Sequence, residues 1–148
     1  MSDRETTPLP SIIFGYGPML PFVAGALGVW LGTPAWQALA LWLTQVWGAL
    51  ILAFVAGVRR GFAFERERAS TPVEIATMIP YVVLAGLGVL LPPLWGVMAL
   101  ALGFALATLI DTRAAKRGNA PAFFARLRPT QFPIAVLSLL AIAARAVV

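Results

Sequence analysis

Long uninterrupted apolar runs are the feature that most limits what this chain can fold into. The clearest run covers residues 36–58 and contains no charged side chain. A helix needs about 20 mostly apolar residues to cross the hydrocarbon core of a bilayer. Because 60% of the 148 residues are hydrophobic and 11% are charged, a water-soluble fold would leave much apolar surface uncovered. The sequence therefore predicts an integral membrane protein.

Similar runs recur along the chain, separated by short polar stretches. We predict an all-α integral membrane bundle of about five transmembrane helices, which form one domain over residues 1–148. The expected helices cover residues 11–31, 36–58, 73–91, 94–110 and 130–148, with a short interfacial segment at 121–128. Pro18 and Pro21 should kink the first helix. Thr71, Pro72 and Glu74 are typical of a helix start, so Glu74 is interpreted as a cap residue before a catalytic one.

The basic residues predict the orientation of this bundle. Five passes place ten of the eleven basic residues on one side and only Arg145 on the other. The ten are Arg4, Arg59, Arg60, Arg66, Arg68, Arg113, Lys116, Arg117, Arg126 and Arg128. Basic loops stay cytoplasmic, so we expect a bacterial inner membrane with the N-terminus cytoplasmic and the C-terminus periplasmic. The mitochondrial inner membrane is the alternative. Trp30, Trp36 and Trp95 fall at the opposite end, where indole rings favour the head-group layer.

Small residues recur every fourth position on two expected helices. These residues are Ala49, Ala53, Gly57 and Gly61 on one helix and Ala99, Gly103 and Ala107 on the other. Such a stripe lets another helix backbone approach closely. Packing within the bundle and docking onto the membrane helix of a partner both explain it, and the sequence does not separate them.

The expected cytoplasmic side carries a collar of arginine and phenylalanine residues. Its members are Arg59, Arg60, Arg126, Arg128, Phe123 and Phe124. The collar is predicted to contact anionic lipid head groups or a partner protein; a solvated basic face that only sets the topology is the alternative. Asp111 would end the fourth helix, where its charge opposes the helix dipole. We therefore predict that it pairs with Arg59, Arg60 or Arg128.

The residue types present argue against a catalytic or metal-binding role. The chain has no cysteine and no histidine, which removes the commonest nucleophiles, bases and metal ligands. Thr44, Gln45, Thr77 and Thr108 are the polar residues expected inside the spans, and no charge is expected in the middle of a span. Ion-coupled carriers usually need intramembrane charge. We therefore expect no enzyme, no metal, no cofactor and no nucleic-acid partner.

Four segments together resemble a known family. They are GYGPMLPFVAGAL (15–27), WGALILAFVAGVRRG (47–61), ATMIPYVVLAGLGVLL (76–91) and ALATLIDTRAAKRGNAPAFFARLRPTQFPIAVLSLL (105–140). Their order and spacing are similar to the small multi-pass family of unknown function that includes mitochondrial transmembrane protein sixty-nine. The matching positions are Phe54, Gly57, Gly61, Pro80, Asp111, Pro121, Leu127 and Arg128. Many members carry a His-Trp pair where this chain has Arg59 and Arg60, so no imidazole role is carried over.

The resemblance implies a small inner-membrane bundle with no established activity. Two functional hypotheses follow from the sequence. The first is a non-catalytic accessory, stabilising or assembly subunit that packs on a larger respiratory or photosynthetic membrane complex. The second is a small transporter or channel, alone or as a homo-oligomer, which would need a polar path that few residues here supply.

Overall fold

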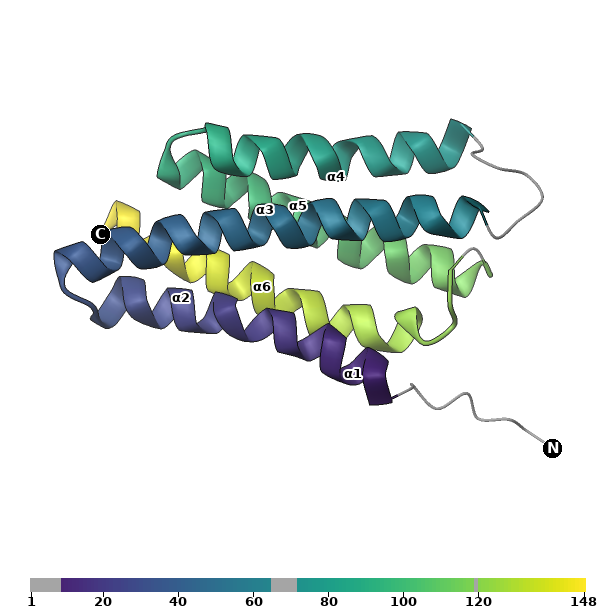
Figure 1. Cartoon of the computed structure of the whole chain (residues 1–148), viewed down its shortest axis with the longest axis horizontal. Helices are drawn as coiled ribbons and strands as arrows, with labels where there is room; N and C mark the ends of the chain where they lie inside the picture. Colours follow the sequence, from purple (N-terminus) through teal and green to yellow (C-terminus); the bar gives the residue numbers. More distant parts are fainter. Residues whose placement is uncertain (1–8, 65–71, 119) are drawn as a thin grey trace.

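The computed structural model describes residues 9–64, 72–118 and 120–148, and the regular structure in these ranges is helical. The first pass consists of helix α1 (Leu9–Tyr16), the 3₁₀ turn η1 (Gly17–Met19) and helix α2 (Leu20–Leu31). The later passes are α3 (Pro34–Phe64), α4 (Pro72–Leu90), α5 (Pro93–Lys116) and α6 (Phe124–Val147). Figure 1 shows these passes lying side by side along one long axis. The predicted all-α bundle is confirmed.

The lengths and surfaces of the helices are those of a membrane bundle. Within the described ranges, four helical segments are long and apolar enough to span a bilayer: Leu9–Leu31, Pro34–Gly61, Pro93–Lys116 and Phe124–Val147. A shorter apolar helix, Ile75–Leu90, lies within α4, which runs beside α3 in Figure 1. Large apolar side chains such as Phe54 (68% exposed) and Leu90 (81% exposed) point outward. Lipid is the solvent that such an outer surface requires.

Several helices extend beyond the ends predicted from hydropathy. Helix α3 continues past residue 58 to Phe64, and α5 continues past residue 110 to Lys116. The separate interfacial segment at 121–128 is wrong, because α6 is continuous from Phe124 and includes Pro129 and Pro133. The length of an apolar run reflects the thickness of the hydrocarbon layer, whereas a helix continues as long as its backbone hydrogen bonds are made. These helices therefore continue through the charged residues that follow the apolar runs.

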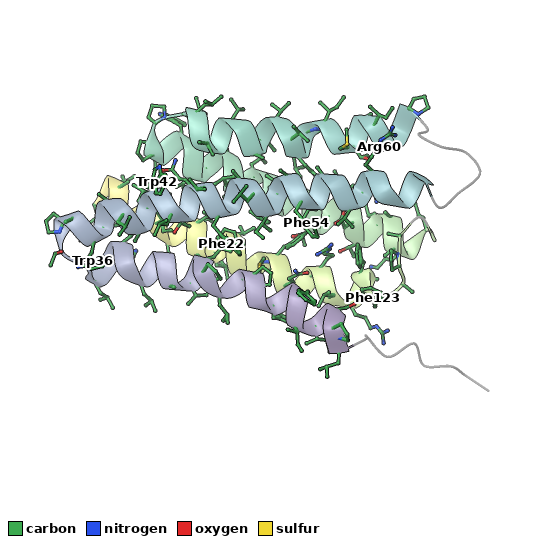
Figure 2. All side chains as sticks on the ribbon, viewed as in Figure 1. Phe22, Trp36, Trp42, Phe54, Arg60 and Phe123 are labelled. Atoms are coloured by element: carbon green, nitrogen blue, oxygen red, sulfur yellow. The ribbon has the colours of Figure 1, made fainter. Side chains whose placement is uncertain are left out.

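The interior of the bundle is an aromatic and aliphatic core. Phe22 of α2 meets Phe104 of α5 edge to face, with ring centroids 5.2 Å apart, and Phe104 meets Phe132 of α6 at 5.5 Å. All three rings are at most 1% exposed. Figure 2 shows Phe22 between the ribbons of the bundle. This aromatic chain joins α2, α5 and α6 through the centre of the fold.

Close helix approaches complete the packing. Helix α5 contacts α3, α4 and α6, and Gly103 faces Leu52 of α3 so closely that a side chain there would overlap it. The side-chain amide of Gln45 donates a hydrogen bond to the carbonyl oxygen of Gly88 at 3.0 Å, which joins α3 to α4.

Candidate functional site

Buried polar residues gather at the end of the bundle where α3 and α5 finish and α6 begins. The cluster consists of Arg59 from α3, Tyr81 from α4, Asp111 from α5, and Arg128 and Gln131 from α6. Each of these side chains is at most 9% exposed. Because polar groups buried away from water need partners, their contacts define what the cluster can do. We call these five residues the ionic cluster.

An ion pair forms the centre of the ionic cluster. The Oδ2 atom of Asp111 lies 3.3 Å from Nε of Arg128, without the alignment of a hydrogen bond. The hydroxyl of Tyr81 donates a hydrogen bond to Oδ1 of the same carboxylate at 3.2 Å. Arg128 is one of the three arginines predicted as partners of Asp111. The position predicted for Asp111 at a helix end is wrong, because α5 continues for more than a turn beyond it.

The guanidinium group of Arg128 is enclosed on its other sides. Its central carbon lies 4.1 Å from the ring centroid of Phe124 and 4.4 Å from that of Phe132, distances typical of cation–π contacts. Its Nη1 atom donates to Oε1 of Gln131 at 2.8 Å. The amide nitrogen of Gln131 in turn donates to the carbonyl oxygen of Gly15 at 2.7 Å. The ionic cluster thus links α1, α4, α5 and α6.

Half of the predicted collar belongs to this interior. Arg59 and Arg128 are 9% and 7% exposed, and Phe124 is 8% exposed, so these three are not surface contacts for lipid or partner. The Nε atom of Arg59 donates to the hydroxyl of Thr77 at 3.5 Å. The surface assignment fails for them because the helices continue past the apolar runs, and the inward face therefore includes residues taken for loops.

The rest of the collar lies nearer the surface. Arg126 is exposed, and Arg60 and Phe123 are half-buried. Figure 2 shows Arg60 and Phe123 at the end of the bundle opposite to Trp36. This separation agrees with the predicted division between a basic end and a tryptophan-marked end.

The two small-residue stripes have different surroundings. On α5, Ala99, Gly103 and Ala107 are buried against neighbouring helices, so this stripe packs within the bundle. On α3, Ala49 is half-buried, whereas Ala53, Gly57 and Gly61 are exposed. Among the described residues, a Cβ atom built at Gly57 or Gly61 meets nothing within 4 Å. Packing within the bundle is therefore the wrong explanation for these three α3 positions.

Two predicted positions lie where the structure describes little. Thr71 is outside the described residues, and the side chain of Glu74 is also outside what is described. Helix α4 begins at Pro72, which the capping pattern makes the first helical residue.

The polar groups of the ionic cluster contact one another across helices. Within the described ranges, no three His, Cys, Asp or Glu side chains come together as a metal site. Asp111 contributes the cluster's one carboxylate, which already contacts both Arg128 and Tyr81. Asp111 and Arg128 both fall within segments long and apolar enough to span a bilayer, Asp111 near the end of Pro93–Lys116 and Arg128 near the start of Phe124–Val147.

Sequence reasoning misses Tyr81, Gln131 and the carbonyl of Gly15. One signal is present: Arg128 and Gln131 are three residues apart, so they share a helix face once α6 is known to begin before them. Tyr81 carries no comparable signal, because a tyrosine in an apolar run is usually packed as an aromatic residue.

The fold and the ionic cluster define a helical membrane bundle fastened at one end by buried charge. The chain belongs to a family described as protein of unknown function (DUF3429), whose family model matches residues 7–144. No curated protein and no solved structure matches the chain. The resemblance to the family that includes mitochondrial transmembrane protein sixty-nine stays a prediction.

Proposed function

We propose that this protein is a non-catalytic accessory, stabilising or assembly subunit of a larger membrane complex, respiratory or photosynthetic. The observation that carries the proposal is the outward stripe of Ala53, Gly57 and Gly61 on α3. Small residues in a membrane helix allow another helix to approach its backbone, and such approach is a main source of helix association in lipid. Across the described part of the chain, no neighbouring residue comes within 4 Å of a Cβ placed at Gly57 or Gly61. This open surface of small residues supports the proposal that a helix of another protein packs there.

The interior supports the same proposal over transport. A transporter or channel built from one chain needs polar groups along its whole length. Here Phe22, Phe104, Phe132 and Leu100 fill the centre and are each at most 1% exposed. The hydroxyls of Thr44 and Thr108 donate to carbonyl oxygens of their own helices instead of facing a shared path. A carrier role therefore has less support than an accessory role.

The proposed location is a bacterial inner membrane with the ionic cluster near the cytoplasmic side. The sequence supports this through the ten-to-one distribution of basic residues between the two sides. Anionic lipid near the exposed Arg126, Arg113 and Arg117 is part of the proposal, because such lipids attract juxtamembrane arginines.

The test is native electrophoresis of mildly solubilised membranes from the source cells, with tagged variants expressed at the natural level. Gly57→Leu should shift the protein from a large assembly to its own small size, because leucine blocks close helix approach. Gly86→Leu is the matched control, because Gly86 is an exposed glycine in α4 and a Cβ built there also meets no described residue within 4 Å. If wild-type protein migrates alone, or if both variants release it equally, the proposed role is wrong.

A further inference from the structure

A pocket of about 290 Å³ lies at the end of the bundle away from the ionic cluster. Residues of α2, α3, α5 and α6 form its walls. Most of these residues are apolar, among them Val29, Leu94 and Ile142. Arg145 and Gln37 are the polar side chains that line it. We call this space the Arg145 pocket. Its combination of apolar walls and one cation is typical of a site for an amphipathic or anionic ligand.

Arg145 is held in place by contacts that leave its hydrogen-bond donors available. The guanidinium carbon lies 5.8 Å from the ring centroid of Trp30, within the range of a cation–π contact. The indole nitrogen of Trp30 donates to the carbonyl oxygen of Ala141 at 2.8 Å, which fixes the ring against α6. Among the described residues, no carboxylate lies within ion-pairing distance of Arg145. A half-buried arginine that has no carboxylate partner can bind an anion from outside the chain through charge-assisted hydrogen bonds.

The helix starts at the pocket add to its positive potential. Pro34 and Pro93, the first residues of α3 and α5, both line the pocket. Neither proline has an N–H group to donate, but the N-terminus of each helix carries a partial positive charge. The side-chain nitrogen of Gln37 donates to the carbonyl oxygen of Gly32 at 2.9 Å, so the amide of Gln37 is itself oriented.

We propose that the Arg145 pocket binds a phosphate group, supplied by a phospholipid head group or by free phosphate. Arginine presents a planar fork of donors that matches phosphate oxygens. The pocket lies at the end marked by Trp36 and Trp95, where the head-group layer is expected. Arg145 is the one basic residue that the five-pass arrangement places at this end, so other arginines of the chain do not compete for the ligand there.

Native mass spectrometry of the delipidated full-length chain tests this proposal. The chain is titrated with a short-chain phosphatidylglycerol in one series and with inorganic phosphate in another. The apparent dissociation constant of the first bound molecule is measured for wild type, Arg145→Gln and Arg113→Gln. Arg113 is exposed near the opposite end of α5, so its substitution removes an equal charge away from the pocket. Arg145→Gln should weaken the first binding event about tenfold or more, the effect of losing a charge-assisted contact.

A second variant distinguishes binding inside the pocket from nonspecific attraction of the anion to the charge of Arg145. Ala146 is exposed and lines the pocket, so Ala146→Phe should fill the space and weaken binding while keeping Arg145. Binding of the lipid without competition from phosphate identifies a head-group site, and binding of phosphate alone identifies an ion site; both support the proposal. Equal weakening by Arg145→Gln and Arg113→Gln overturns it, as does unchanged binding in Arg145→Gln or Ala146→Phe. Circular dichroism of each variant establishes that the helices are retained.

Discussion

The carboxylate of Asp111 is the anion that faces the buried Arg128 in the ionic cluster. Asp111→Asn removes one charge while keeping the size of the side chain and an acceptor for the Tyr81 hydroxyl. Arg128, which is 7% exposed and lies between Phe124 and Phe132, is then left as a buried cation without its anion. Removing one partner of a buried pair typically costs about 3–5 kcal/mol. Because polar groups also find partners in the unfolded state within a membrane, we expect about 3 kcal/mol, the low end of that range.

The measurement is reversible unfolding in mixed micelles, followed by helical circular dichroism as the fraction of denaturing detergent rises. Arg128→Met should cost a similar amount, because it leaves the buried carboxylate of Asp111 alone. The double variant should cost at least about 2 kcal/mol less than the sum of the two, since neither charge is then unpaired. Arg113→Gln, an exposed change on the same helix, should alter stability by less than about 0.5 kcal/mol. A cost below about 1 kcal/mol for Asp111→Asn, or simple additivity, would refute the reasoning.

Two further expectations concern packing and orientation. Gly103→Ala places a methyl group against Leu52 and should destabilise the bundle by about 1–3 kcal/mol. Gly86→Ala places its methyl group in open space and should be neutral or stabilising. Equal effects of the two variants in the same micelle unfolding assay would contradict the described packing. Because the chain has no cysteine, Lys116→Cys and Val147→Cys each introduce a single thiol at opposite ends of the bundle. A membrane-impermeant maleimide added to intact cells should label only Val147→Cys, and labelling of Lys116→Cys instead would reverse the proposed orientation.

Hydropathy and residue pattern are enough to predict the architecture. The apolar runs predict a helical membrane bundle, and the two-residue gap between the helices expected at 73–91 and 94–110 predicts the tight connection between α4 and α5. The stripe of Ala99, Gly103 and Ala107 indicates close packing, with packing inside the bundle as one of its two explanations. These features are local or periodic in the sequence, so one chain suffices to read them.

The candidate site can be predicted only in part, because it depends on where helices end. The sequence identifies Asp111 and Arg128 as possible partners, but the apolar runs assign both to the edge of the membrane. Helix α6 begins at Phe124, which turns Arg128 inward, while Arg126, two residues earlier, points outward. A shift of one or two positions rotates a side chain by a large part of a turn. The hydropathy profile does not show which of two polar residues, such as Arg126 and Arg128, faces the interior of the bundle.

The same packing explains why a costly ion pair fits this bundle. Gly103 and the small residues beside it leave the surface of α5 with few protruding side chains. Such an apolar surface only weakly opposes the sliding of one helix along another. The attraction between Asp111 and Arg128 depends on the distance between the two charges, and Gln131 adds a hydrogen bond from the same helix to the carbonyl of Gly15. Displacing α6 along α5 by one turn would separate the charges by about 5.4 Å and leave both buried. We infer that the ionic cluster contributes mainly to the register of the helices, since a buried pair adds little net stability over an apolar pair.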